Sequence, residues 1–207
     1  MQIMSDLAAA NDGLSLAKLA EQSALPKTTL FSLLRSLEQG GFVVSEGGHH
    51  RLGPEAFKLA AAIGKHGSFS GRLRPILEWL HGETDETCLL GIPAADWNVL
   101  VFADVIESSS SLRFTARIGA ERQLYSTSVG LALVAFAPAD QQRKYLERVR
   151  FEKFTPATVG SVAALQKLLQ RIRRGGYVVN SGSVTGATAT GAPVFGPDSA
   201  VAASISV

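Results

Sequence analysis

Turn-forming residues divide the chain as far as Pro54 into short segments, and these breaks limit what the segments can build. The breaks are four short groups: Asn11-Asp12-Gly13, Leu25-Pro26, Gly40-Gly41 and Gly47-Gly48. Glycine adopts backbone conformations that other residues avoid, and proline interrupts a helix that reaches it. Neither a long helix nor a long strand can cross these points, so we expect short helices and one short hairpin.

The segments between the breaks predict three helices followed by a hairpin. Apolar residues recur at helical spacing in residues 2–10, 16–23 and 26–39. The hairpin is expected from residues 42–46 and 49–52, and a fourth helical stretch, residues 54–66, follows it. The order helix, helix, short turn, helix, hairpin is typical of a winged helix-turn-helix.

The third expected helix has a leucine side and a polar side. Its leucines share one side at helical spacing and are expected to pack against the first two helices: Leu30, Leu33, Leu34 and Leu37. The opposite side carries two hydroxyls, a guanidinium and an amide: Thr28, Ser32, Arg35 and Gln39. A side of this kind can approach DNA closely, because Arg35 can donate to a guanine edge and Gln39 to an adenine edge.

Neighbouring residues complete a candidate DNA-binding set. Lys27 and the free N–H groups at the helix start suit a phosphate, and the wing residues 49–51 (His-His-Arg) can reach the backbone or a minor groove. The candidate DNA-binding residues are Lys27, Thr28, Thr29, Ser32, Arg35, Gln39 and Arg51. The alternative is an ordinary solvated surface, since any surface helix carries polar residues opposite a leucine stripe.

The charge of this region does not by itself favour DNA binding. Residues 1–66 contain six Lys or Arg and six Asp or Glu, whereas a DNA-binding domain normally has a basic excess that neutralises phosphates. The positive field would have to come from the arrangement of the charges or from dimerisation. A helical head that binds a protein partner instead of DNA therefore stays a second interpretation.

The remainder of the chain alternates expected strands and helices. The expected helices are residues 71–83, 126–137, 138–149 and 162–174, and the expected strands are residues 87–92, 98–106, 110–117, 177–179, 192–195 and 201–207. This order favours an α+β domain with an antiparallel sheet over the βαβ alternation of a dinucleotide-binding domain. We expect a first domain at residues 1–53, a linker helix at residues 54–70 and a second domain at residues 71–207.

Composition excludes several classes of protein. Hydrophobic residues make up 46% of the 207 residues and the formal net charge is +2, which excludes intrinsic disorder. Cys88 is the single cysteine, so no disulfide framework can form within the chain. The sequence has no apolar run of about 18 residues and no signal peptide at its start, so we expect a cytoplasmic protein without a membrane partner.

No enzyme motif is evident in the sequence. A Walker sequence, GxSxG, HExxH and a paired Cys-x-x-Cys are all missing. Cys88 lies in an apolar run, which favours a core position over a nucleophile, and the adjacent His49 and His50 are more often solvent-exposed than metal-binding. The glycine-rich residues 180–191 can cradle a phosphate but are not followed by GK[ST]. We therefore expect no catalysis, no metal and no cofactor.

Across nearly its whole length, the chain resembles the IclR family of bacterial transcriptional regulators. The matching segments are residues 14–44 and 51–53 in the first part and residues 117–119, 124–135, 174–177 and 186–194 in the second. The same order of motifs across two domains is more specific than the helix-turn-helix pattern alone. The resemblance implies a winged helix-turn-helix, a linker helix and an effector-binding domain related to the GAF fold.

The resemblance also implies a function. Proteins of this family bind palindromic operator DNA as dimers or tetramers, more often as repressors, and a small metabolite in the effector domain rearranges the DNA-binding heads. Carried over to this sequence, the effector positions are Phe114, Gly119, Ser128, Val129, Asn180, Ala189 and Ser206. Ser204 joins them because it shares a strand face with Ser206. The helix start near Ser126 adds free N–H groups that suit an anion, while local backbone bonds are the alternative role of the serines.

Some positions depart from the residues that are common in the family. Ser32 stands where the recognition helix often has a basic residue, so a different operator sequence is expected. Tyr125 replaces a common histidine, and Leu131 a common lysine. Asn180 replaces an acidic residue and Ala189 a cysteine. The uncharged Asn180 favours a larger or less polar ligand over a small 2-oxo acid, and we expect an organic or aromatic acid. Both ends are expected to be trimmed, with a C-terminal helix missing.

Overall fold

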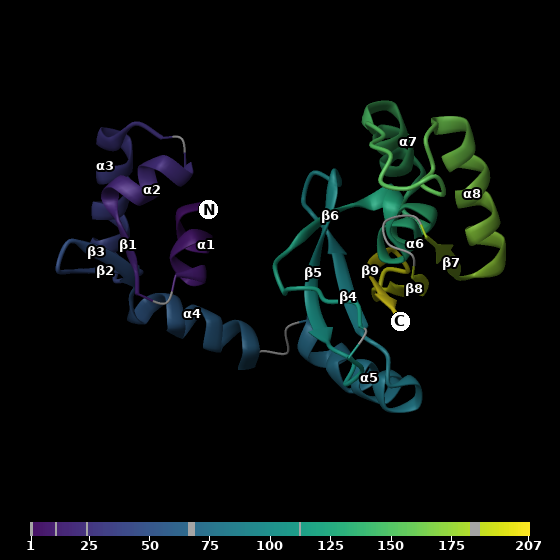
Figure 1. Ribbon diagram of the computed structural model, residues 1–207, viewed down its shortest axis with the longest axis horizontal. Helices are drawn as coiled ribbons and strands as arrows, with labels where there is room; N and C mark the ends of the chain where they lie inside the picture. Colours follow the sequence, from purple (N-terminus) through teal and green to yellow (C-terminus); the bar gives the residue numbers. More distant parts are fainter. Residues whose placement is uncertain (1, 11, 24, 66–68, 112, 183–186) are drawn as a thin grey trace. The chain divides into compact units, whose positions relative to one another are not determined.

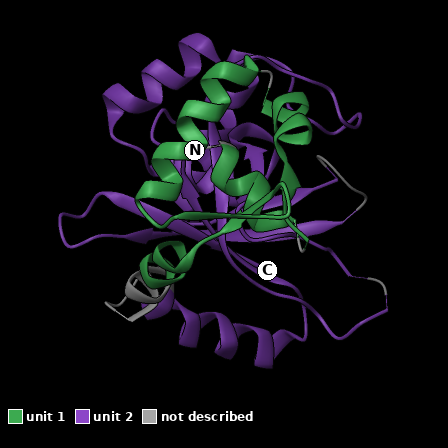
Figure 2. Cartoon of the chain, turned by 90° about the vertical axis from the view of Figure 1, so that its left-hand side faces the viewer, with its two compact units in different colours: residues 1–68 green, residues 69–207 purple. Residues whose placement is uncertain are grey.

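The chain forms two compact units. The computed structural model describes residues 2–10, 12–23, 25–65, 69–111, 113–182 and 187–207. Unit 1 is residues 1–68 and unit 2 is residues 69–207, and Figure 2 shows the two in different colours. Each unit buries its own set of apolar side chains. The helices and antiparallel sheets together confirm the expected α+β class.

Unit 1 has the expected order of helices and hairpin (Figure 1). Its helices are α1 (Gln2–Ala9), α2 (Leu16–Ser23), α3 (Lys27–Gln39) and α4 (Pro54–Lys65). Its strands, in the antiparallel order β1-β3-β2, are β1 (Leu14–Ser15), β2 (Val43–Glu46) and β3 (His49–Leu52). The β2–β3 hairpin turns through Gly47 and Gly48, whose φ angles of 57° and 77° favour glycine.

The core of unit 1 lies between α1, α2, α3 and β2. Its buried side chains are Ile3, Leu7, Leu19, Leu30, Leu34 and Val43. The sequence predicts that Leu33, like the other leucines of α3, packs against the first two helices, but this residue is 43% exposed. It lies at the edge of the apolar side, next to Leu30 along the helix, and this edge remains in solvent.

The boundary of α3 also differs slightly from the expected one. The sequence predicts Pro26 as the first helical residue, but its ψ of 138° is extended and it is the N-cap. Its carbonyl accepts a hydrogen bond from the Leu30 N–H at 3.0 Å, which is the first bond of the helix. At the other end, Gly41 has a φ of 71°, and its N–H donates to the Glu38 carbonyl at 2.9 Å. Glycine therefore ends the helix as expected.

Unit 2 is built on a six-stranded antiparallel sheet in the order β6-β5-β4-β9-β8-β7. The strands are β4 (Cys88–Pro93), β5 (Val99–Ile106), β6 (Glu121–Gln123), β7 (Val178–Ser181), β8 (Thr188–Phe195) and β9 (Val201–Ser206). The helices are α5 (Phe69–Thr84), the 3-10 turn η1 (Leu124–Ser126), α6 (Ser128–Phe136), α7 (Ala139–Arg148) and α8 (Val162–Gly175). No helix within the described residues is both long and apolar enough to cross a membrane.

Helices cover the two faces of this sheet. On one face, Leu100 and Phe102 of β5 pack with the buried side chains of α6, and α8 adds Leu165 and Leu169 to the same core. On the other face, Leu77 of α5 packs with side chains from β4 and β9. The start of α6 is therefore held between the sheet and the outer helices, with every residue from Ser128 to Ala135 buried.

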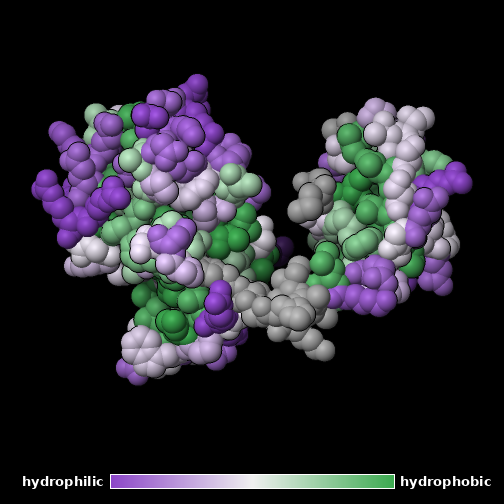
Figure 3. Space-filling model, turned by 180° about the vertical axis from the view of Figure 1, so that it is seen from behind, coloured by the Kyte–Doolittle hydropathy of each residue, from purple (hydrophilic) through white to green (hydrophobic). Residues whose placement is uncertain are grey.

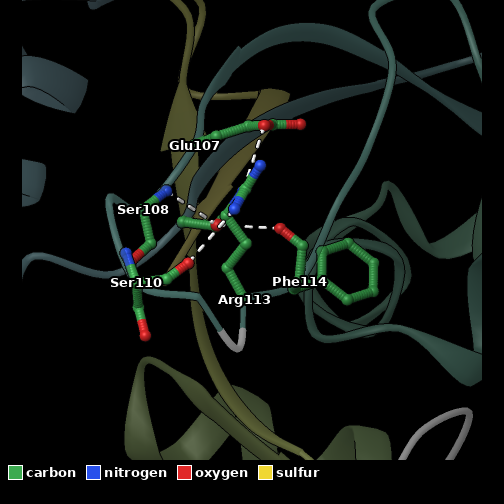
Figure 4. Close-up of polar contacts among 6 residues, drawn as sticks. Glu107, Ser108, Ser110, Arg113 and Phe114 are labelled. Atoms are coloured by element: carbon green, nitrogen blue, oxygen red, sulfur yellow. Dashed lines mark hydrogen bonds and ion pairs between the residues drawn. The ribbon is translucent and has the colours of Figure 1, made fainter.

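Among the described residues of the range 110–117, the expected strand does not form. The Thr87 hydroxyl accepts a hydrogen bond from the Ser108 N–H at 3.1 Å and donates to the Phe114 carbonyl at 2.8 Å. Ser108 in turn accepts from the Ser110 N–H at 3.0 Å, so side chains satisfy backbone groups that a strand would pair with a neighbour (Figure 4). The edge of the sheet is formed instead by the short β6.

The small-residue helix begins two residues later than residue 126, the expected start. Leu124–Ser126 form the 3-10 turn, and Thr127 is the N-cap, whose hydroxyl accepts from the Gly130 N–H at 3.0 Å. The turn brings Leu124 against the helix so closely that a Cβ on Gly130 would lie 2.2 Å from the Leu124 carbonyl oxygen. Gly130 therefore permits the sharp entry of the chain into α6.

Candidate functional site

The polar side of α3 faces solvent. Each of the candidate residues on this helix is exposed: Lys27, Thr28, Thr29, Ser32, Arg35 and Gln39. The Ser32 hydroxyl donates to the Thr28 carbonyl at 3.2 Å, so it lies close to its own helix. No ion pair within the described residues includes Arg35. Its guanidinium is thus available to donate to a partner outside the chain.

The wing is joined to the end of α3 by a side-chain contact. His50 of β3 places Nδ1 3.2 Å from Oε1 of Glu38, and its side chain is largely buried. Glu38 lies one helical turn after Arg35. This contact fixes the hairpin relative to the polar side of α3, which sequence reasoning did not anticipate because the two residues are twelve positions apart.

Arg51 holds the wing to the turn between α1 and β1. Its Nε donates to the Asp12 carbonyl at 3.2 Å, and its Nη1 lies 4.0 Å from Oε2 of Glu46. Gly13 makes room for the stem, since a Cβ there would lie 2.6 Å from Cγ of Arg51. The side chain is still half exposed, so further N–H groups of the guanidinium remain for the phosphate contact we predict.

The candidate effector residues gather mainly at the start of α6. Oγ of Ser128 lies 2.7 Å from Oγ of Ser206 on β9, and both residues are buried. Nδ2 of Asn180 on β7 donates to the Ser126 carbonyl at 3.0 Å, and Ala189 of β8 is paired opposite Asn180. Residues from three strands therefore lie near η1 and the start of α6.

The other effector candidates are placed differently. Val129 follows Ser128, and its side chain lies against Gly91 of β4. The approach is so close that a Cβ on Gly91 would lie 2.3 Å from Cγ1 of Val129. Ser204 is buried on β9 and its hydroxyl donates to the Ala192 carbonyl at 2.9 Å. Phe114 and Gly119 are exposed in the irregular segment between β5 and β6, and no hydrogen bond among the described residues joins them to the group at α6.

The first turn of α6 has the electrostatics of an anion site. The first hydrogen bonds of the helix run from the Gly130 N–H to the Thr127 hydroxyl and from the Leu131 N–H to the Thr127 carbonyl. The N–H groups of Ser128 and Val129 come before these donors in the chain, so they have no acceptor within the helix. The helix dipole adds a positive end at the same place. The serine hydroxyls bond within the protein: Ser126 donates to the Gln123 carbonyl at 3.2 Å, and Ser128 is paired with Ser206. An anion here would therefore exchange the serine pair for new bonds.

Two surface hollows lie elsewhere, and neither contains a candidate effector residue. One is lined by Leu52, Pro54, Phe57 and Lys58, and the other lies along α7 and the start of α8. Cys88 is buried in the sheet, and burial raises the pKa of its thiol. A thiol with a raised pKa is a poor nucleophile, in agreement with the core position expected from the sequence.

Sequence reasoning missed Thr87, Gly91 and Gly130 as residues that shape this region. Thr87 organises the segment that carries Phe114 through two hydrogen bonds, and the two glycines allow Val129 and Leu124 to approach closely. A glycine inside a strand or a helix is a signal of close backbone approach. This signal is present at both positions and could have identified them.

Comparisons with known proteins match both units. The IclR helix-turn-helix domain matches residues 1–47, and the bacterial transcriptional regulator IclR C-terminal domain matches residues 65–207. HTH-type transcriptional regulator BhcR of Paracoccus denitrificans is 31% identical over 98% of this chain and 73% of its own. Transcriptional repressor IclR of Escherichia coli is 28% identical over 86% of this chain and 65% of its own. The chain thus spans just under two thirds of the length of the second relative.

A solved structure has the same fold. An IclR homologue from Microbacterium hydrocarbonoxydans, complexed with 4-hydroxybenzoate, superimposes with a TM-score of 0.80 at 23% identity, covering 100% of this chain and 85% of that chain. The curated relatives are transcriptional regulators rather than enzymes, in agreement with the expectation that this chain is not an enzyme. The domain matches and these relatives show that the chain belongs to the IclR family of bacterial transcriptional regulators.

Proposed function

We propose that this chain is a ligand-responsive transcriptional repressor that binds operator DNA through unit 1 and a small organic acid through unit 2. The observation that carries the proposal is the exposed polar side of α3, where Arg35 has no ion-pair partner among the described residues. A helix with such a side fits the major groove. We assign DNA binding to residues 1–53, the linker to residues 54–70, which include α4, and effector binding to residues 71–207.

Within unit 1, the proposal divides the exposed residues by role. Thr28, Ser32, Arg35 and Gln39 contact base edges, because they share the outward side of α3. Lys27, Thr29 and Arg51 contact phosphates, since the first two lie at the positive end of the helix and Arg51 lies on the wing. The protein acts as a homodimer or tetramer in the cytoplasm, in which two heads read the two halves of a palindrome.

The effector site is centred on the first turn of α6. A carboxylate can accept hydrogen bonds from the N–H groups of Ser128 and Val129 and from the Ser128 hydroxyl. Asn180, which already donates to the Ser126 carbonyl, adds no negative charge to repel the ligand. The relative that holds 4-hydroxybenzoate supports an aromatic acid. Phe114, Gly119, Ala189, Ser204 and Ser206 are proposed as further parts of this site.

The first experiment is a fluorescence-anisotropy titration of the full chain with a labelled duplex from the DNA upstream of its own coding region. We expect binding that weakens with rising salt, and a shift of at least tenfold in Kd when one aromatic or aliphatic carboxylate of a panel, including 4-hydroxybenzoate, is added. A folded chain that binds no duplex at low salt would contradict the DNA-binding role. Binding that no carboxylate shifts would contradict the effector class.

Replacement of Ser128 by alanine is expected to weaken binding of the carboxylate that gives this shift. A hydrogen bond to a charged group contributes about 1.5–3 kcal/mol, so the Kd of the effector should rise at least tenfold. Isothermal titration calorimetry measures this change directly. Ser126→Ala is the matched control, because Ser126 lies in η1, before the first turn of α6, and its hydroxyl donates to the Gln123 carbonyl. Equal losses in both variants would place the ligand elsewhere.

A further inference from the structure

The basic residues of the chain are concentrated in one part of unit 2. Unit 1, residues 1–68, has six Lys or Arg and six Asp or Glu. Residues 153–197 contain no Asp or Glu at all, but they contain five basic residues: Lys153, Lys167, Arg171, Arg173 and Arg174. Most of these lie on α8, so the region with an unbalanced positive charge is not the helix-turn-helix.

Three of these residues form a continuous line on the outer side of α8, which we call the basic stripe: Lys167, Arg171 and Arg174. They are spaced at i, i+4 and i+7, which places them on one side of the helix as successive neighbours. The opposite side is anchored in the core by Leu165, Leu169 and Ile172. All three residues of the basic stripe are exposed, and hydrophilic side chains gather over the part of unit 2 that carries α7 and α8 (Figure 3).

Two basic residues of the adjacent helix α7 have a carboxylate within 4.0 Å, whereas those of the basic stripe have none within the described residues. On α7, Nζ of Lys144 lies 3.4 Å from Oδ2 of Asp140. Nε of Arg143 lies 4.0 Å from Oε1 of Glu147. No ion pair within the described residues includes a residue of the basic stripe. The stability of α8 does not require this arrangement, because like charges at i, i+3 and i, i+4 destabilise a helix. The helix dipole favours Arg174 in the last turn but not Lys167 in the middle of the helix.

We propose that the basic stripe binds the phosphate backbone of duplex DNA without regard to base sequence. The inference rests on the proposed function, since it requires a chain that binds DNA. Phosphate neutralisation supplies a large part of protein–DNA affinity, and unit 1 has no net charge to provide it. The basic stripe extends about 10 Å along α8, which matches about three phosphate-to-phosphate intervals along the axis of one strand. A second copy is a poor partner, because a two-fold axis would bring the like charges together.

The test removes the charges of the basic stripe and compares the loss with a matched control. The variant K167Q/R171Q/R174Q keeps good helix formers in α8. The control R72Q/R117Q/R122Q removes the same number of exposed charges from other parts of unit 2. Anisotropy titrations over a range of KCl concentrations use the upstream duplex and a scrambled duplex of equal length. Circular dichroism verifies the fold of each variant, and the single variants K167Q and R171Q give the effect per charge.

For the stripe variant we expect equal weakening on both duplexes, at least tenfold near about 100 mM KCl. The slope of log K against log [KCl] should become about 3 units shallower, at about 0.9 per lost phosphate contact. The control should change the Kd less than twofold. An unchanged salt slope, or an equal loss of DNA affinity in both triple variants, would overturn the proposal. Loss of binding to polyglutamate with unchanged binding to DNA would overturn it in favour of an acidic protein partner.

The same titrations separate this inference from the proposed function. If wild type binds neither duplex, then both fail. If wild type prefers the upstream duplex and the stripe variant behaves like wild type, only the inference about α8 fails. The inference is supported if the stripe variant binds both duplexes more weakly than wild type but still prefers the upstream duplex over the scrambled one.

Discussion

Replacement of Gly130 by alanine is expected to lower the free energy of unfolding of unit 2 by more than about 3 kcal/mol. Ordinary overpacking of a core costs about 1–3 kcal/mol, and here the added atom would overlap the backbone. The added Cβ would lie 2.2 Å from the Leu124 carbonyl oxygen and 2.5 Å from its Cα. Both are backbone atoms, so no change of side-chain rotamer can relieve the overlap. Urea unfolding followed by circular dichroism and by Trp79 and Trp97 fluorescence measures the loss.

The matched control for this prediction is Gly82→Ala. Gly82 lies inside α5, and a Cβ there would meet no heavy atom within 4 Å. Alanine in place of an exposed helical glycine stabilises by about 0.5–1 kcal/mol. The two substitutions are therefore expected to change the free energy of unfolding in opposite directions. A small effect of Gly130→Ala would show that Leu124 of η1 does not lie this close to α6.

Replacement of Arg35 by alanine is expected to relax the operator selectivity of the protein at one position of each half-site. Arg35 is exposed on the polar side of α3 and makes no ion pair within the described residues, so its contribution should appear only when DNA is bound. The loss of discrimination against the wrong base at that position should be about 1–3 kcal/mol. Competition titrations with duplexes that carry single base changes measure it.

A phosphate contact should behave differently, and Lys27→Ala provides the contrast. We expect this variant to weaken binding to operator and scrambled duplexes alike and to make the salt slope about one unit shallower. Unchanged selectivity in Arg35→Ala, or the same uniform loss in both variants, would count against the assignment of Arg35 to base readout.

The elements of unit 1 could be predicted closely because local residues end each one. Gly41, Gly47 and Gly48 have the positive φ angles that their turns require, and these constraints act over a few residues only. The exposure of Leu33 could not be predicted, because periodicity shows which residues share a side but not how far neighbouring helices extend over it.

In unit 2, the errors come from contacts between distant parts of the chain. The segment around Phe114 has the composition of a strand, but Thr87, far earlier in the chain, takes its backbone hydrogen bond. The pair between Ser128 and Ser206 spans 78 residues, so only the resemblance to a family, and no local pattern, placed both in one site. Whether this group holds an effector stays a prediction.

The position of β9 in the sheet has a consequence for how the protein is made. β9 lies between β4 and β8, and its pairs Leu89↔Ser206 and Gly91↔Ser204 join residues more than a hundred positions apart. On the ribosome, β4 must therefore wait on the order of ten seconds for its partner at usual synthesis rates. During that interval its apolar edge is exposed to other nascent chains. We expect a chaperone requirement during translation that unit 1, whose small sheet is complete once Leu52 has been added, does not share.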